Sequence, residues 1–479
     1  MVSPQSRSRD AGAGSGASRP IVGVQGLGFV GAAMAIAIAG ARGPDGCPRF
    51  DVVGVELPTA EGRAKVDALN AGRLPMAVAD VHLAEALDEA HTAGNLRATT
   101  DDLAFADASV TIVDVPVDLV SDDGIPAADF SVLRRAVRTL GRRLRPGSLV
   151  VVESTVPPGT TERVVAPELA RALGERSVAS DAVLLAHSFE RVMPGDEYLS
   201  SLIRYWRCYA GTTPKAADAC ERFLAQVIDV DAYPLTRLGS TTASETAKVL
   251  ENSYRATTIA LMQEWGRLAE AVGVDLFEVV EAIRRRPTHS NMRVPGFGVG
   301  GYCLTKDPLF GAVASRQLFG NPEIAFPISE QAVAVNQNMP IASLDKLEEM
   351  LGGSLAGRTV LLMGVSYRPG VADTRHSASA TFVRAALARG ARVRCHDPLV
   401  SRWSELEMEV ETELPRPNGV HAVVFAVADR LYGALDVAEW LGEERPAILD
   451  ANAVLTAGQR AQLRAHGCQV TSVGRGDGL

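Results

Sequence analysis

The chain has 479 residues, of which 47% are hydrophobic and 22% charged, and its formal net charge at pH 7 is −9. At roughly 150 residues per domain, this length predicts about three domains of a folded globular protein. The negative charge gives no general attraction to a polyphosphate backbone, so we expect no nucleic-acid partner.

The start of the chain, residues 1–19, is rich in Ser, Gly, Ala and Arg and lacks the apolar centre of a secretory signal. We therefore expect a disordered tail. No apolar run approaches the ~20 residues that a membrane span needs, so the sequence predicts a cytoplasmic protein with no membrane partner.

Short β-rich runs alternate with helical stretches over residues 20–230. These runs lie at 20–25, 50–56, 109–116, 148–155 and 182–188. Strands that are nearly all apolar and are separated by helix-length segments indicate a parallel sheet covered on both faces. The pattern predicts a doubly wound domain that ends near Val230.

A long helix is predicted over residues 241–272, with Gly273 as its stop signal. Its apolar positions advance by threes, fours and sevens; they are Ala247, Leu250, Tyr254, Leu261, Trp265, Leu268 and Val272. At 1.5 Å per residue the helix would be roughly 48 Å long, more than one small domain needs. We expect it to bridge domains or subunits.

The strand and helix alternation resumes after a second helical region, with strands predicted at 358–365, 391–397, 421–428 and 447–452. The predicted fold class is therefore α/β, with two doubly wound domains joined by an all-helical one. We place these domains at residues 20–230, 231–345 and 346–479.

A glycine-rich turn, Gly26-Leu-Gly28-Phe29-Val30-Gly31, follows the first predicted strand and opens a predicted helix. In a dinucleotide-binding turn the first glycine permits the tight turn, the second lets the backbone approach the pyrophosphate, and the third allows close packing of helix on strand. The context predicts a dinucleotide site rather than a plain tight turn.

Glu56 ends the second predicted strand. An acidic side chain there can accept hydrogen bonds from the ribose 2′-hydroxyl and repel a 2′-phosphate, which favours NAD over NADP. The alternative is a solvated strand-end carboxylate, because the loop at 42–49 lengthens the usual spacing.

Six cysteines are scattered without CxxC pairs or Cys/His clusters, which argues against a disulfide framework and predicts no metal site. They are Cys47, Cys208, Cys220, Cys303, Cys395 and Cys468. Cys303 differs from the others because the glycine-rich segment 296–301 precedes it and Asp307 follows four residues later. Glycines let a ligand approach the thiol, and a carboxylate can orient or deprotonate a water, so we interpret Cys303 as a nucleophile rather than a buried structural thiol.

Lys248 and Asn252 lie four residues apart on the long helix and therefore share one face. An ammonium beside an amide donor suits an oxyanion or a developing alkoxide, and its charge favours a thiolate. By itself such a pair is more often a solvated helix face.

Six ordered motifs resemble the signatures of the UDP-glucose/GDP-mannose dehydrogenases. They are GLGFVG at 26–31, ESTVPPGT at 153–160, ERVMPG at 190–195, TAKVLENSYR at 246–255, GFGVGGYCLTKD at 296–307 and YRPGVADTR at 367–375. The resemblance covers about residues 20–460. It implies two Rossmann-like domains, NAD bound in the first and a UDP-sugar in the third, and a homodimer built on the long helix.

The resemblance also implies a four-electron oxidation of a sugar C6 alcohol, typical of polysaccharide biosynthesis. Two hydrides leave C6, with a thiohemiacetal and then a thioester on Cys303, before water releases the acid. It implies that Lys248 and Asn252 stabilise alkoxide-like intermediates, that Asp307 serves the lysine or the water, and that Thr155 and Glu190 position water and assist proton transfer.

Further ligand contacts follow from the same resemblance. Cofactor contacts are implied at Gly26, Gly28, Phe29, Val30, Gly31, Glu56, Pro116, Thr155 and Arg375. Substrate contacts are implied at Glu190, Arg191, Lys248, Asn252, Gly300 and Arg368.

The sequence also departs from the family pattern. Val117 replaces a threonine in the family's VPTP, Phe189 replaces a proline, and Arg368 replaces a lysine that commonly contacts substrate. An arginine often found after Asp450 is missing at Asn452-Ala453. These departures concern the sugar rather than the cysteine chemistry.

The sequence favours UDP-glucose or a UDP-N-acetylhexosamine over GDP-mannose, and the choice of sugar stays open. The loop at 286–293 is similar to the UDP-N-acetylhexosamine branch, whereas Lys306-Asp307 is closer to the UDP-glucose branch. Two rival functions are a two-electron dehydrogenase of the 3-hydroxyacid type, which needs no Cys303, and a non-catalytic nucleotide-sugar-binding protein.

Overall fold

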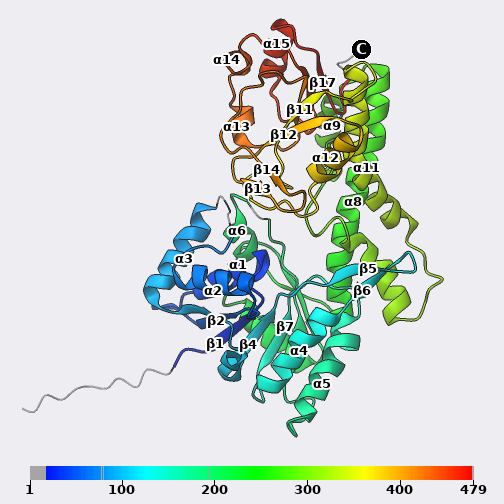
Figure 1. The fold of residues 1–479 in the computed structure, drawn as a ribbon. Helices are drawn as coiled ribbons and strands as arrows, with labels where there is room; N and C mark the ends of the chain where they lie inside the picture. The colour runs from blue at the N-terminus through cyan, green and yellow to red at the C-terminus, as the bar shows by residue number, and fades with distance from the viewer. Residues whose placement is uncertain (1–17, 77, 79, 194, 477–479) are drawn as a thin grey trace, which may run out of the picture.

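The computed structural model describes residues 18–76, 78, 80–193 and 195–476. It contains two large sheets, one mainly parallel and one wholly parallel, in the two halves of the chain, with a helical region between them (Figure 1). This confirms the predicted α/β class. The tail expected at 1–19 lies almost entirely outside the described residues.

The first sheet has eight strands in the order β10-β9-β8-β7-β4-β1-β2-β3. Its strands are β1 (Ile21–Gln25), β2 (Asp51–Val55), β3 (Leu96–Thr99), β4 (Ala108–Val113), β7 (Leu149–Val152), β8 (Leu184–His187), β9 (Cys208–Gly211) and β10 (Thr236–Arg237). Its helices are α1 (Phe29–Ala39), α2 (Ala60–Asn70), α3 (Val81–Ala93), α4 (Ser131–Arg143), α5 (Ala166–Gly174), α6 (Tyr198–Ile203) and α7 (Pro214–Leu224). A hairpin of β5 (Asp118–Asp122) and β6 (Ile125–Asp129) extends from it.

The strands predicted from their apolar runs form the centre of this sheet, where both faces are covered. One pairing differs from the predicted parallel arrangement, because β9 runs antiparallel to β8. The segment between them contains only the six-residue helix α6 and so makes no full crossover. The edge strand β10 also lies beyond Val230, the predicted end of the first domain.

The long helix α8 (Thr241–Val272) has the bounds that the sequence predicts. Ser240 caps its N-terminus by accepting the Ala243 N–H, and Gly273 ends it in the left-handed conformation at φ 74°. In Figure 1, α8 runs from the first sheet towards the second.

Shorter helices pack beside α8. They are α9 (Leu276–Arg284), α10 (Phe310–Val313) and α11 (Pro327–Met350), and α11 lies along α8. Because α11 continues to Met350, the predicted domain boundary at 345 falls inside a helix.

The second sheet has the order β12-β11-β15-β16-β17, and all its pairings are parallel. Its strands are β11 (Thr359–Met363), β12 (Arg392–His396), β15 (Ala422–Phe425), β16 (Ala447–Asp450) and β17 (Val470–Ser472). A small pair, β13 (Arg402–Trp403) and β14 (Met408–Glu409), is separate, and the helices are α12 (Ala378–Ala388), α13 (Arg430–Gly433), α14 (Val437–Leu441) and α15 (Ala457–Ala465). In the described part of the chain, no helix combines the length and apolarity needed to cross a membrane.

Candidate active site

The turn between β1 and α1 has the shape that a dinucleotide needs. Gly26 adopts φ 92°, which favours glycine, and a Cβ on Gly31 would overlap the carbonyl oxygen of Gly26. Gly28 caps α1, and a Cβ added there would meet no heavy atom within 4 Å. The N-terminus of α1, which begins with Phe29 and Val30, therefore faces an open cradle that fits a pyrophosphate.

Glu56 lies one residue beyond β2, beside this turn. Its carboxylate accepts the Leu27 N–H at 2.9 Å and the Leu57 N–H at 2.8 Å. The Lys65 ammonium lies 3.8 Å from the same group. The structure thus places Glu56 where a dinucleotide ribose would lie in a fold of this type.

Two further predicted cofactor residues follow strands at the same edge of the sheet. Pro116 is exposed in the segment after β4, and Thr155 is half-buried after β7. The Ser154 hydroxyl joins the two segments, since it accepts the Val115 N–H at 2.9 Å and donates to the Val115 carbonyl at 2.7 Å. Both residues lie at the carboxyl ends of parallel strands, where ligands bind in open α/β sheets.

Arg375 comes from the second α/β half of the chain but lies against the dinucleotide turn. Its guanidinium is 5.4 Å from the centre of the Phe29 ring and 5.8 Å from that of Tyr302. Asp373 holds it through hydrogen bonds of 2.8 to 2.9 Å. The cofactor turn, the cysteine loop and the second α/β half therefore meet at Arg375.

The glycine-rich loop before Cys303 packs tightly against the second α/β half. A Cβ on Gly300 would lie 2.6 Å from the His376 carbonyl oxygen, and one on Gly301 would lie 2.9 Å from the Tyr367 ring. Gly301 also adopts φ 81°. Only glycine fits this close approach without displacing its neighbours.

Cys303 is exposed to solvent, although neighbouring protein atoms displace much of the water around its thiol. This loss of surrounding water raises the pKa of the thiol to about 12, the negative charge of Asp307 adds to the effect, and Lys248 opposes it. A ligand can therefore reach a thiol that is protonated at neutral pH in the ligand-free protein.

Lys248 is buried on α8 and faces Glu190. Its Nζ donates to the Glu190 backbone carbonyl at 2.8 Å and lies 3.5 Å from the carboxylate of the same residue. Burial by itself would lower the pKa of Lys248, but the negative charge of Glu190 is the main influence that raises it above its usual value. The ammonium thus stays charged in a position where it can stabilise an oxyanion.

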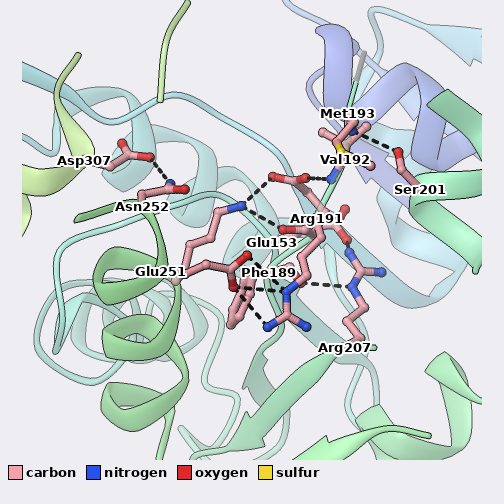
Figure 2. A network of polar contacts seen from close by, with 12 residues as sticks. Glu153, Phe189, Arg191, Val192, Met193, Ser201, Arg207, Glu251, Asn252 and Asp307 are labelled. Carbon is pink, nitrogen blue, oxygen red and sulfur yellow. Dashed lines mark hydrogen bonds and ion pairs between the residues drawn. The ribbon is translucent and has the colours of Figure 1, made fainter. Parts of the chain in front are cut away.

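Asn252 lies one turn further along α8 and binds Asp307. Its Nδ2 donates to Asp307 Oδ2 at 2.8 Å (Figure 2). The other carboxylate oxygen makes no hydrogen bond among the described residues, and the Lys306 ammonium lies 3.4 Å from it. Burial raises the pKa of Asp307, against the opposing charges of Lys306 and Lys248. An incompletely paired buried carboxyl is suited to take up a proton during a reaction.

Two predicted substrate residues have other partners. Figure 2 shows Arg191 paired with Glu251 of α8, at 3.0 Å, and its guanidinium also donates to the Trp206 carbonyl. The Arg368 guanidinium lies beside Gly195, at the end of the ERVMPG segment. Arg368 thus reaches the loop of Glu190, whereas Arg191 is occupied by a structural ion pair.

The sequence did not reveal two contacts that shape this region. Arg207 and Glu153 form a fully buried ion pair, and Arg207 also donates to the Phe189 carbonyl at 3.0 Å (Figure 2). Lys306 donates to the Val117 carbonyl at 2.7 Å. Lys306 lies inside the cysteine motif and could have been singled out, but Arg207 lies in no motif.

Three sequence profiles of the UDP-glucose/GDP-mannose dehydrogenase family match the chain in order. The NAD binding domain matches residues 21–224, the central domain residues 242–338 and the UDP binding domain residues 361–457. The chain belongs to this family. It is therefore an NAD-dependent nucleotide-sugar dehydrogenase, as the six motifs predicted.

Similar proteins carry related names. The UDP-N-acetyl-D-mannosamine dehydrogenase of Pyrococcus horikoshii is 30% identical over 408 residues, which cover 85% of this chain and 88% of that protein. The NDP-N-acetyl-D-galactosaminuronic acid dehydrogenase of Ralstonia nicotianae is 30% identical, and the match covers 76% of this chain and 79% of that protein.

Solved structures show the same likeness. A UDP-D-ManNAc dehydrogenase from Pyrococcus horikoshii has a TM-score of 0.79 at 27% identity, covering 95% of this chain and 100% of that one. A UDP-glucose dehydrogenase from Pyrobaculum islandicum has a TM-score of 0.76 at 29% identity, and the match covers 93% of this chain and 97% of that one.

Proposed function

We propose that the protein oxidises the C6 alcohol of a UDP-N-acetylhexosamine to a carboxylate, with Cys303 as the covalent nucleophile. The observation that carries this proposal is that an accessible cysteine, Cys303, lies within electrostatic reach of the buried Lys248 ammonium and of Asp307, which Asn252 binds. The names of the relatives support the N-acetylhexosamine, while the UDP-glucose dehydrogenase among the similar structures keeps UDP-glucose as the second candidate.

The reaction removes four electrons, which NAD takes up as two hydrides in two rounds. In the first, the C6 hydroxyl proton passes to a water held by Thr155 and Glu190, and Lys248 stabilises the alkoxide from which the first hydride leaves. The Cys303 thiol then adds to the aldehyde, and its proton ends on the new hydroxyl. Loss of a second hydride and of that proton gives a thioester, which water cleaves with Asp307 as the proton acceptor. Thr155 and Glu190 position this water.

The stoichiometry of NADH tests the reaction class. A panel of UDP-glucose, UDP-N-acetylhexosamines and GDP-mannose is screened for NADH formation. Each molecule of the UDP-sugar that is consumed should yield two NADH and one uronic acid. One NADH per substrate would support the two-electron rival, and the absence of NADH with every sugar would support a binding protein without catalysis.

Variants of Cys303 test the covalent mechanism. Cys303→Ala should bind UDP-sugar and NAD but lose carboxylate production, because no thioester can form. Cys303→Ser can still form an ester, which hydrolyses slowly, so intact-mass spectrometry should detect a sugar adduct. If Cys303→Ala makes uronic acid at close to the wild-type rate, the covalent mechanism is wrong.

The position of Glu56 leads to a prediction about the cofactor. A carboxylate at the ribose repels a 2′-phosphate, so NAD should exceed NADP in kcat/KM by at least about tenfold, or about 1.4 kcal/mol. Glu56→Gln should lower the ratio of kcat/KM for NAD to kcat/KM for NADP. Equal use of the two cofactors by the wild-type enzyme would mean that Glu56 is not part of the cofactor site.

A homodimer completes the proposal. Apolar side chains of α8 remain exposed in the single chain, among them Leu250 at 65%, Tyr254 at 53% and Trp265 at 52%. A second copy of the same helix would cover them through a two-fold interface. Several expectations from the sequence stay predictions. They are the ligand contacts of Gly300, Arg368 and Arg375, the boundaries of the three domains and the cytoplasmic location.

A further inference from the structure

The end of β4 places a carboxyl group at the crevice of the first sheet. In the strand order, β2 and β3 lie on one side of β1, and β4 and β7 lie on the other. A ligand crevice forms at such a reversal, outside the carboxyl ends of the strands. Asp114 directly follows β4, and its N–H donates to the Gln25 carbonyl at the end of β1. It therefore lies at the reversal point.

Asp114 also lies directly against the glycine turn. A Cβ on Gly26 would overlap the Asp114 carbonyl oxygen, and a Cβ on Gly31 would lie 3.1 Å from the Asp114 Cβ. Oδ2 of Asp114 is buried and has no hydrogen-bond partner among the described residues. A buried oxygen of this kind is costly when the carboxyl is ionised.

Three charged or titratable groups on neighbouring segments lie around Asp114. Glu190 follows β8, Tyr198 lies on α6, and Arg207 precedes β9. Arg207 is already paired with Glu153 at the end of β7. Burial raises the pKa of Asp114 to about 8, the negative charge of Glu190 adds to this, and Arg207 opposes it. These influences favour the carboxylic acid over the carboxylate at neutral pH.

We infer that Asp114 is a further cofactor-binding residue, which accommodates the NAD diphosphate as a neutral acid and repels it when ionised. The reason is the close approach of Asp114 to Gly26 and Gly31, next to the N-terminus of α1 that would hold the diphosphate. A carboxylate there would put another negative charge beside two phosphates. NAD affinity should then fall as the pH rises through the titration of Asp114.

Calorimetric titration of the full chain with NAD, and separately with ADP-ribose, tests this inference. For the wild type, the Kd should weaken about tenfold between pH 7 and pH 9, because only the protonated form binds well. ADP-ribose should show the same change, since it carries the diphosphate without the nicotinamide. Near pH 8, titrations in two buffers of different ionisation enthalpy should reveal proton uptake on binding.

The isosteric variant Asp114→Asn cannot ionise, so its Kd should change less than about threefold over this pH range. Asp114→Ala should be equally insensitive to pH, although weaker in binding, and serves as a second variant. The matched control is Asp118→Asn, an exposed carboxylate four residues along the chain, which should keep the wild-type dependence. Wild-type pH dependence in Asp114→Asn, or a wild-type ADP-ribose affinity that does not change with pH, would overturn the inference.

Discussion

Each of the two faces of α8 departs from that of an ordinary surface helix. Such a helix buries an apolar stripe and exposes polar side chains. On α8 the buried face includes polar residues at the end near the first sheet, namely Thr241, Ser244, Glu245, Lys248 and Asn252. The exposed face carries apolar residues, namely Leu250, Tyr254, Leu261, Trp265, Leu268 and Val272.

The buried polar face is stable because each group has a partner. Glu245 accepts the N–H groups of Gly159 at 2.5 Å and Thr161 at 2.7 Å, and Lys248 and Asn252 bind Glu190 and Asp307. Buried polar groups without partners would cost free energy. This face therefore joins the first sheet to the cysteine loop, whereas nothing among the described residues covers the exposed apolar face. The comparison teaches that one helix serves catalysis on one side and association on the other.

The largest effect is expected on the buried face, from Lys248→Ala. Without the ammonium, each step that builds negative charge on the sugar oxygen loses its stabilising cation, so kcat/KM should fall by about 10² to 10³-fold. Lys346→Ala is a matched control, since Lys346 lies on α11 and pairs with Glu270, away from Cys303. Initial rates of NADH formation measure both variants. If kcat/KM falls by less than tenfold in Lys248→Ala, Lys248 takes no part in the chemistry.

The bounds of α8 and the dinucleotide turn could be predicted because their signals are local. Ser240, Gly273 and the glycines at 26, 28 and 31 act through backbone conformation within a few residues. The orientation of α8 could not be predicted in this way. Periodicity found the stripe that includes Leu261 and Trp265, but it does not say whether the chain itself or another copy covers that stripe.

Contacts between distant segments explain the other differences. The Glu153–Arg207 pair joins residues 54 positions apart, and only Glu153 lies in a motif. The pairing of Arg191 with Glu251 likewise depends on how α8 crosses the loop after β8. Ion pairs of this kind follow from tertiary packing, which no local pattern encodes.

A second test of the buried face concerns Glu245. Burial raises the pKa of this carboxyl to about 7 from the usual value of 4.5, although hydrogen bonds from Thr161 and Gly159 oppose the change. Because the folded-state pKa is the higher one, this group contributes stability below pH 4.5 that is lost as the pH rises through 7. The loss amounts to about 3 kcal/mol of the free energy of unfolding.

Glu245→Gln should therefore reduce the difference between the unfolding free energies at pH 5 and pH 8 by an amount of that order, as measured by urea titration. Glu264→Gln, an exposed substitution on the same helix, should leave the difference unchanged. An unaltered difference in Glu245→Gln would mean that this carboxyl is already ionised in the folded protein at pH 5.

The smallest expected effect concerns the exposed face and tests its role in association. Trp265→Ala removes an aromatic side chain that is 52% exposed in the single chain, and large aromatic residues at the centre of an interface commonly contribute about 2 kcal/mol or more. The Kd of the homodimer should then weaken by at least about 30-fold, measured by sedimentation velocity across a dilution series. Leu431→Ala, an exposed apolar residue on α13 and far from α8 in the sequence, is the control and should leave the Kd unchanged.

At protein concentrations high enough to restore the dimer, Trp265→Ala should form NADH at the wild-type rate per chain, because the substitution leaves the buried face of α8 intact. If Trp265→Ala and the wild type dissociate at the same concentration, the exposed face of α8 is not the interface, and the division between a catalytic and an associating face is wrong.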